Sequence, residues 1–322
     1  MHDVSKALRA DGAKPELVAL VDIILGAATQ IAQCVRQGAL AGVLGSTDDE
    51  NIQGETQKKL DVIANQLLKD ALLQCTDVCA LASEEEDTPV VGNPEGKYLV
   101  AFDPLDGSSN IDINGQVGTI FTIFPALRDI AFDSEQQFHQ PGTQQLCAGY
   151  VLYGGSTLLV VSVGGATRCF TLDAASGNFV LTQARLHIPA DTQEFAINLS
   201  NQRFWRPAFK QYVDDLIAGD TGPRKKNYNM RWNAAMVGDV HRVLMRGGIF
   251  SYPSDSRNPR QPAKLRLLYE SNPMALLIEG AGGKAWTETQ RILSLQPTAL
   301  HQRVAVILGS ANEVDACLAY LK

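Results

Sequence analysis

VAFDPLDGSSNID, residues 100–112, is the stretch that best predicts both the fold and the site. It continues an apolar run over residues 98–102, which predicts a short buried strand. The strand gives way at Pro104 to a loop that carries Asp103 and Asp106. Two carboxylates at one strand end can converge on a single cation, and oxygen ligands are those that Mg²⁺ prefers.

The small residues Gly107, Ser108 and Ser109 directly follow the two acids. They leave backbone N–H groups and two hydroxyls free to face an anion. A cation site that leads into a phosphate cradle is typical of metal-assisted phosphoryl chemistry. The alternative is an acidic surface turn, because Asp, Pro, Gly and Ser are common in turns. That alternative is favoured for an isolated DxxD motif, but the longer string here favours the functional interpretation.

The length and charge of the chain limit what it can do. Its 322 residues are enough for two domains, which we place at residues 1–185 and 186–322. The net charge of −7 argues against a nucleic-acid-binding surface, which needs a basic stripe. A negatively charged protein that handles phosphates needs metal ions or a local basic patch, so the charge fits a cation-dependent enzyme.

The six cysteines indicate a reduced protein. Only Cys75 and Cys79 are close in sequence, and no nearby histidine completes a zinc site with them. The N-terminus has no apolar signal core, and no uninterrupted apolar run of 18 residues occurs. We therefore expect a cytoplasmic protein that is not secreted by that route and does not span a membrane.

The hydrophobic pattern predicts a mixed α/β fold. Residues 1–15 are expected to be a frayed arm, and 38–54 a long mobile loop of the kind that covers active sites. Helical periodicity predicts helices over residues 16–36, 57–73, 207–218, 229–245 and 313–321, with another that starts at Asn272. Short β-branched or aromatic runs predict strands over 119–124, 149–153, 157–163, 169–172, 179–182, 194–199 and 304–308. The middle third is therefore expected to form a largely antiparallel sheet.

Two further acidic positions have two interpretations each. Asp61 lies near the first turn of a predicted helix, and complementing the helix dipole is the better interpretation when that helix is taken alone. The run LASEEED, residues 81–87, is typical of a solvated turn. It also ends an apolar stretch shortly before the strand that leads to Asp103. Both strand ends can then lie at one rim of a sheet, where ligands bind in α/β proteins.

With these motifs the chain resembles class I fructose-1,6-bisphosphatases from about Val35 to Gly309. The strings that carry the resemblance are QKKLD, LASEEED, DPLDGSSNID, GGIFSYP, KLRLLYE, NPMALLIEGAGG and HQRVAVILGS. The resemblance implies a sugar-phosphatase fold with alternating helix and sheet layers. It also implies hydrolysis of the 1-phosphate of D-fructose 1,6-bisphosphate by a metal-activated water, in gluconeogenesis or a carbon-fixing cycle.

The resemblance also implies roles for individual residues. Asp61 and Glu84 would orient and deprotonate the attacking water, with Glu85 close by. The implied metal ligands are Glu84, Asp103, the backbone carbonyl of Leu105, Asp106 and Glu270. The implied substrate ligands are Asp106, Gly107, Ser108, Ser109, Asn198, Arg231, Tyr252 and Lys264. The cofactor would be two or more Mg²⁺ ions per subunit, for which Mn²⁺ can substitute.

Arg231 matches a family arginine that reaches the 6-phosphate of a neighbouring subunit, so the resemblance implies a homo-oligomer, expected to be a tetramer. Glu55 takes the place of a family acid on the 38–54 loop. Trp232 stands where the family commonly has a tyrosine, so the 6-phosphate pocket is expected to differ in detail. At the family's AMP site Lys97 is retained, but Pro125 replaces an arginine. We therefore expect weak or absent inhibition by AMP.

Three alternatives remain to be weighed against this reading. A broader sugar bisphosphatase that also accepts sedoheptulose 1,7-bisphosphate would share all of this chemistry. An inositol monophosphatase fits less well, because Lys264, Arg231 and Tyr252 make a second anion site that a monophosphate does not need. A non-catalytic regulator on the same fold would be expected to have lost a ligand acid, and none of these acids is lost.

Overall fold

The structure, a computed structural model, describes residues 2–50 and 56–322. Its larger sheet has eight strands in the order β10-β9-β8-β7-β6-β5-β3-β4. These strands are β3 (Val78–Ser83), β4 (Val90–Val91), β5 (Tyr98–Asp106), β6 (Val117–Pro125), β7 (Cys147–Tyr153), β8 (Thr157–Ser162), β9 (Arg168–Asp173) and β10 (Asn178–Gln183). Neighbours from β5 to β10 pair antiparallel, which confirms the antiparallel sheet predicted for the middle third.

The pairing of β3 with β5 is parallel and positions the site. Ser83 at the end of β3 lies opposite Phe102 of β5, and the Glu84 N–H donates to the Phe102 carbonyl at 3.1 Å. The carboxyl ends of both strands therefore meet at one edge of the sheet. The sequence-based placement of LASEEED beside the loop after Phe102 is confirmed.

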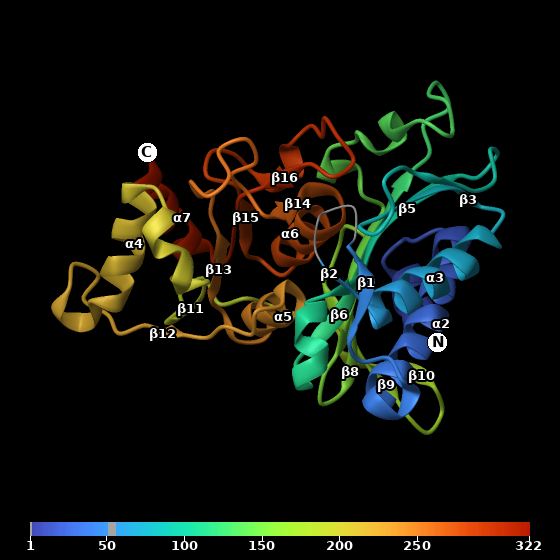
Figure 1. Cartoon of the computed structure of the whole chain (residues 1–322), viewed down its shortest axis with the longest axis horizontal. Helices are drawn as coiled ribbons and strands as arrows, with labels where there is room; N and C mark the ends of the chain where they lie inside the picture. The colour runs from blue at the N-terminus through green and yellow to red at the C-terminus, as the bar shows by residue number, and fades with distance from the viewer. Residues whose placement is uncertain (1, 51–55) are drawn as a thin grey trace.

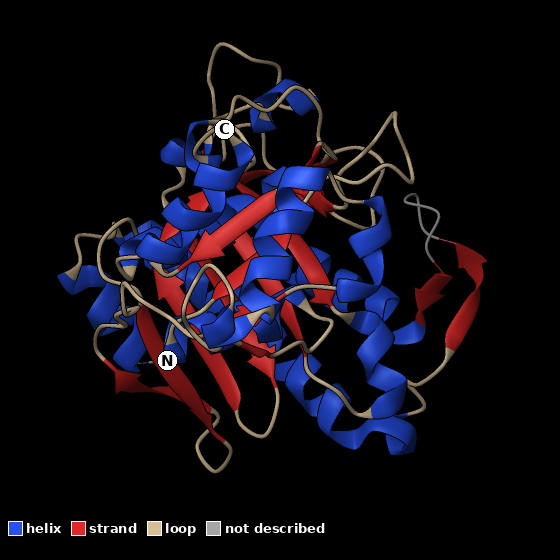
Figure 2. Cartoon of the chain, turned by 90° about the vertical axis from the view of Figure 1, so that its left-hand side faces the viewer, coloured by secondary structure: helices blue, strands red, loops and turns tan. Residues whose placement is uncertain are grey.

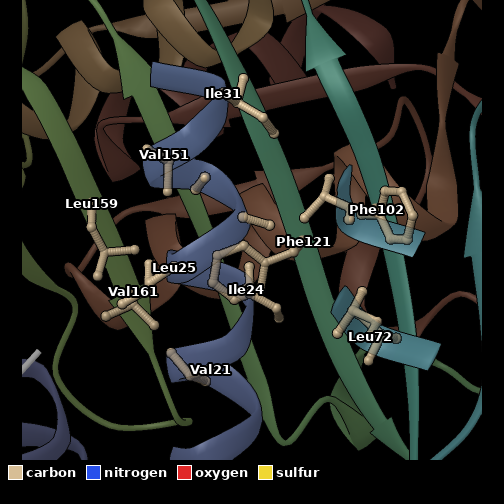
Figure 3. Close-up of a cluster of buried hydrophobic side chains, with 14 of the residues drawn as sticks. Val21, Ile24, Leu25, Ile31, Leu72, Phe102, Phe121, Val151, Leu159 and Val161 are labelled. Carbon is tan, nitrogen blue, oxygen red and sulfur yellow. The ribbon is translucent and has the colours of Figure 1, made fainter. Parts of the chain in front are cut away.

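Helices α2 (Pro15–Gln37) and α3 (Lys59–Leu73) cover one face of this sheet. Figure 3 shows Ile24 of α2 beside Phe121 of β6 and Leu25 beside Val161 of β8, and all four side chains are buried. By length and composition, residues 15–41 could also cross a membrane, but half of the apolar window is buried inside the protein. The burial is that of a core helix, because apolar residues at helical spacing face the sheet.

The second sheet has five strands in the order β12-β11-β13-β17-β15. They are β11 (Glu194–Ala196), β12 (Asn229–Met230), β13 (Ile249–Tyr252), β15 (Lys284–Trp286) and β17 (Val306–Gly309). A short ladder joins β14 (Leu265–Arg266) to β16 (Arg303–Val304). The remaining helices of this part are α4 (Pro207–Ile217), α5 (Met236–Arg246), α6 (Asn272–Gly280) and α7 (Ala311–Leu321).

The elements stack as alternating layers (Figures 1 and 2). Helices α5 and α6 contact strands of both sheets and so form the middle layer, while α4 and α7 pack together on the outer face of the smaller sheet. From one side to the other the order is α2 and α3, large sheet, α5 and α6, small sheet, α4 and α7. The predicted α/β fold with alternating helix and sheet layers is confirmed.

Two predictions for the first fifty-eight residues are wrong in part. The expected frayed arm contains helix α1 (His2–Ala10), whose Val4 and Leu8 are fully buried. The expected loop contains a short turn, Gly38–Ala41, and β1 (Ser46–Glu50), the first strand of an antiparallel hairpin. The second strand, β2 (Thr56–Lys58), takes the first residues of the helix expected over 57–73, which begins at Lys59. Polar composition concealed this hairpin, since its backbone pairing needs no apolar alternation. Glu55 lies outside the described residues.

The second half also corrects three boundaries. The helix expected over 229–245 is strand β12, a loop, and then α5, which begins only at Met236. The strand expected over 194–199 ends at Ala196, and Asn198 instead caps the following turn by accepting from the Ser200 N–H. The strand expected over 304–308 is divided between β16 and β17.

Candidate active site

A cavity of about 310 Å³ lies at the carboxyl edge of β3 and β5, against the start of α5 and the segment after β13. It collects every predicted site residue except Arg231. Those residues are Asp61, Glu84, Glu85, Asp103, Leu105, Asp106, Gly107, Ser108, Ser109, Asn198, Tyr252, Lys264 and Glu270. Among the described residues, six acids and two cations, Lys264 and Arg266, line this cavity, so its lining has more acidic than basic side chains.

Three of the acids converge. Oxygens of Asp103, Asp106 and Glu270 all lie within 4.8 Å of one another, and all three residues are buried. Glu270 belongs to the widened helical turn Leu267–Ser271 between β14 and α6, and its Oε2 accepts from the Arg266 N–H at 2.5 Å. Carboxylates gathered from two separate elements in this way match the oxygen donor set of a hard divalent cation.

Glu84 is held differently from these three acids. Its Oε1 lies 2.7 Å from Nη1 of Arg266, and both side chains are nearly buried. A side-chain hydrogen bond also joins Glu84 to Asp103. Arg266 belongs to the string KLRLLYE, but no role in the site was assigned to it from the sequence. Arg266 and Glu84 are far apart in the sequence and meet only through tertiary packing, so no local sequence pattern predicts their contact.

Burial makes these carboxylates difficult to ionise. It raises the pKa of Glu84, Asp106 and Glu270 to about 7, against the opposing effect of Arg266 on the two glutamates and of the Val237 N–H on Asp106. The pKa of Asp103 is raised by burial and then by the neighbouring acids Glu84 and Asp106. Buried anions that repel one another are stabilised by a cation between them. The residues therefore fit a divalent metal ion.

Asp61 lies at the first turn of α3 and faces the same cavity. Its Oδ2 accepts from the Lys58 N–H at 2.9 Å, so the carboxyl lies at the helix N-terminus, where the helix-dipole interpretation placed it, and also satisfies a backbone donor there. Burial nevertheless raises its pKa to about 7, helped by the charge of Glu85 and opposed by hydrogen bonds from Lys58 and Ser108. A carboxyl that titrates near neutral pH and lies beside a phosphate-binding loop suits general base catalysis.

The Gly-Ser-Ser loop packs against the start of α5. Gly107 has a φ of +78°, and a Cβ built there would lie 2.4 Å from the Cβ of Ala235, so both backbone and space require glycine. Asp106 Oδ2 accepts from the Val237 N–H at 2.7 Å. This bond fixes where α5 begins. Ala234, Ala235 and Met236 consequently line the cavity, and sequence reasoning missed them because it extended the helix through them.

The part of the cavity lined by Lys264, Tyr252 and Trp232 is more exposed than the part lined by the acids. Lys264 is exposed, and the Tyr252 hydroxyl is within 3.4 Å of Nδ2 of Asn201. Trp232 stacks on Phe250 with an interplanar angle of 6°. Arg231 is exposed and does not line the cavity, so within one chain it does not meet the other predicted substrate ligands.

Comparison with known proteins covers the whole chain. The family described as "Fructose-1-6-bisphosphatase, N-terminal domain" matches residues 2–184, and its C-terminal counterpart matches residues 188–322. The class 1 fructose-1,6-bisphosphatase of Cellvibrio japonicus is 70% identical over 321 residues, covering 100% of this chain and 99% of that protein. The Saccharophagus degradans enzyme of the same class is 63% identical over 321 residues, with 100% of both chains covered.

Solved structures agree with this. The crystal structure of Leishmania major fructose-1,6-bisphosphatase in holo form is 39% identical in sequence and superposes with a TM-score of 0.92. The match covers 99% of this chain and 98% of the Leishmania chain. The T-state structure of the same enzyme superposes with a TM-score of 0.84 over 96% of this chain and 94% of its own.

Proposed function

The chain belongs to the class 1 fructose-1,6-bisphosphatase family, and we propose that its buried acids hold a divalent metal for the reaction that it catalyses. That reaction is hydrolysis of the 1-phosphate of D-fructose 1,6-bisphosphate, which gives fructose 6-phosphate and phosphate. The imbalance of six acids over two cations, counted over the described residues that line the cavity, carries the proposal. A sugar bisphosphate is itself strongly anionic, so it cannot enter such a cavity without added positive charge.

The metal we propose is Mg²⁺, at two or more ions per subunit, with Mn²⁺ able to replace it. Asp103, Asp106 and Glu270 would hold it, joined by Glu84 and the Leu105 carbonyl. The donor set consists of oxygens, which favours these hard cations over zinc. When bound, such an ion neutralises phosphate charge and acts as a Lewis acid.

Other side chains of the cavity bind the 1-phosphate or transfer the proton of the attacking water. Asp61 and Glu84, with Glu85 beside them, orient the attacking water and accept its proton, which the raised pKa values of Asp61 and Glu84 permit near neutral pH. Gly107, Ser108 and Ser109 hold the 1-phosphate through backbone N–H groups and hydroxyls.

In the more exposed part of the cavity, Asn198, Tyr252 and Lys264 bind the sugar and the 6-phosphate. Their donors fix the far end of the substrate and so orient the reacting phosphate. The exposed Arg231 completes this pocket in a neighbouring subunit, which requires a homo-oligomer, and we propose a tetramer. Its position outside the cavity of its own chain supports action in trans.

The proposed division into domains follows the same chemistry. Residues 1–185 carry the metal and phosphate loop, and residues 186–322 carry the sugar-binding groups. We place the enzyme in the cytoplasm, in gluconeogenesis or a carbon-fixing cycle. The alternative of a broader bisphosphatase that also uses sedoheptulose 1,7-bisphosphate is not favoured, because the matched relatives are named as fructose-1,6-bisphosphatases.

Phosphate release from fructose 1,6-bisphosphate tests the proposal. We expect release of one phosphate per substrate with Mg²⁺ and none after treatment with EDTA, with activity restored by Mg²⁺ or Mn²⁺. Inositol 1-phosphate, which lacks the second anion, should be a poor substrate. Equal turnover with and without EDTA would refute the role given to the acids.

A further inference from the structure

A buried polar network lies directly behind Glu84 and Glu85, outside the lining of the cavity. Ser83, fully buried at the end of β3, donates from its hydroxyl to Oδ1 of Asn65 at 2.8 Å. Asn65, only 8% exposed, donates in turn from Nδ2 to Oε1 of Glu86 at 2.8 Å. The Glu85 N–H donates back to the Ser83 hydroxyl at 3.2 Å.

The side chain of Asn65 therefore contacts the residue before Glu84 and the residue after Glu85. It brackets the pair from both sides. Asn65 also follows Asp61 by one helical turn on α3, so the two lie on the same face of that helix. One amide thus connects the helix that carries Asp61 to the turn that carries the two glutamates.

The amide of Asn65 satisfies both ends of this arrangement. The position must accept a hydrogen bond from Ser83 and donate one to Glu86 at the same time, and a carboxylate in its place would have no donor and would repel Glu86. Lys69, one turn further along α3, also forms an ion pair with Glu86 and holds the same end of the network. Because the network is largely buried, losing one partner leaves another group unsatisfied.

We propose that Asn65 is a positioning residue for hydrolysis: it fixes the spacing between the Asp61 carboxylate on α3 and Glu84 and Glu85 at the end of β3. Its effect passes through Asp61 and the glutamates, and the inference rests on the roles proposed for them above. Displacement of a reacting group by about 1 Å can cost on the order of 100-fold in rate, even when the mutated residue is remote from the chemistry.

The test is a double-mutant cycle on turnover. Asn65→Ala should lower kcat by about 10- to 100-fold, while KM for fructose 1,6-bisphosphate changes by less than about twofold, since Lys264 and Tyr252 lie in the more exposed part of the cavity. In the Asp61→Asn background, Asn65→Ala should reduce kcat by less than about threefold more, because residues that act as a unit are non-additive. Ser83→Ala removes the bond between Asn65 and the strand but leaves the bond from Asn65 to Glu86, and it should also lower kcat.

The control is Gln66→Ala, which removes an exposed hydrogen bond to Asp70 on the same helix and should keep wild-type kcat. Thermal unfolding of each variant identifies any that does not fold, in which case Ser83→Ala carries the test. Wild-type kcat in Asn65→Ala or in Ser83→Ala would overturn the inference, as would a full multiplicative loss in the Asp61→Asn background. Wild-type kcat in Asp61→Asn alone would instead refute the proposed role of Asp61, which separates the two failures.

Discussion

Charged side chains are clustered both in the active-site cavity and at the surface around Lys97, but the two clusters differ in burial and in the ratio of acids to cations. In the part of the chain that the structure describes, six acids and two cations line the cavity, and most of the acids are buried. At the surface Lys97 lies between two acids, with Nζ 3.0 Å from Glu16 and 3.4 Å from Asp77, and its side chain is 52% exposed. The buried acids of the cavity favour either bound protons or a bound cation, whereas the exposed Lys97 already has two carboxylate partners. Local charge balance, more than the presence of charged residues, indicates where ions bind.

The largest effect should come from Asp61. Asp61→Asn removes the group proposed to accept the proton of water, so kcat should fall by about 100-fold or more, while KM for fructose 1,6-bisphosphate stays within a few-fold. Steady-state kinetics measure both. The matched control is Asp70→Asn, an exposed acid on the same helix, which should leave kcat unchanged. Comparable losses of kcat in Asp61→Asn and Asp70→Asn would show that the loss does not depend on the position of Asp61 in the cavity.

A smaller effect is expected at Lys264, one of the two cations of the cavity. Charge-assisted hydrogen bonds contribute about 1.5–3 kcal/mol, so Lys264→Gln should raise KM by roughly 10- to 100-fold at little cost to kcat. Lys210→Gln, which breaks only a surface pair with Asp214, provides the control. An unchanged KM in Lys264→Gln would remove this residue from the 6-phosphate pocket.

The pH dependence of stability distinguishes buried from exposed acids. Glu84, Asp106 and Glu270 have pKa values of about 7 in the fold and about 4 in an unfolded chain. Between these values the metal-free folded protein binds more protons than the unfolded chain, so its stability should fall as the pH rises from about 4 to about 7. Mg²⁺ binds the ionised carboxylates, so its binding displaces those protons.

The increase in Tm on adding Mg²⁺ should therefore be larger near pH 8 than near pH 5. Differential scanning calorimetry at the two pH values measures it. Replacing Glu16, whose carboxyl is exposed and paired with Lys97, by Gln should leave this difference as it is. A Tm increase that is independent of pH would show that the cavity acids are already ionised without metal.

The smallest effect is predicted for AMP. Lys97 is held by Glu16 and Asp77, and Pro125, at the end of β6, offers no cation for a phosphate. AMP should therefore inhibit weakly or not at all, as measured by fructose 1,6-bisphosphate turnover over a range of AMP concentrations. Half-maximal inhibition at micromolar AMP would contradict the contrast drawn between the two regions.

Much of the site could be predicted because its chemistry is local in sequence. Asp103, Asp106 and the Gly-Ser-Ser loop lie in one string, and a parallel pair of strands brings Glu84 to the same edge. Arg266 could not be assigned, since its contact with Glu84 depends on how the turn before α6 packs against β3. The start of α5 was missed for the same reason: a hydrogen bond from Val237 to the distant Asp106 fixes it, and helical periodicity does not record that bond.

The most direct measurement is the release of protons when Mg²⁺ binds. Isothermal titration of Mg²⁺ into metal-free protein near pH 7, in two buffers of different ionisation enthalpy, counts the protons that leave. Because several cavity acids have pKa values of about 7, binding should release on the order of one proton or more per subunit. Asp103→Asn should weaken that binding. No measurable Mg²⁺ binding, or binding without proton release, would contradict the assignment of the buried acids as the metal site.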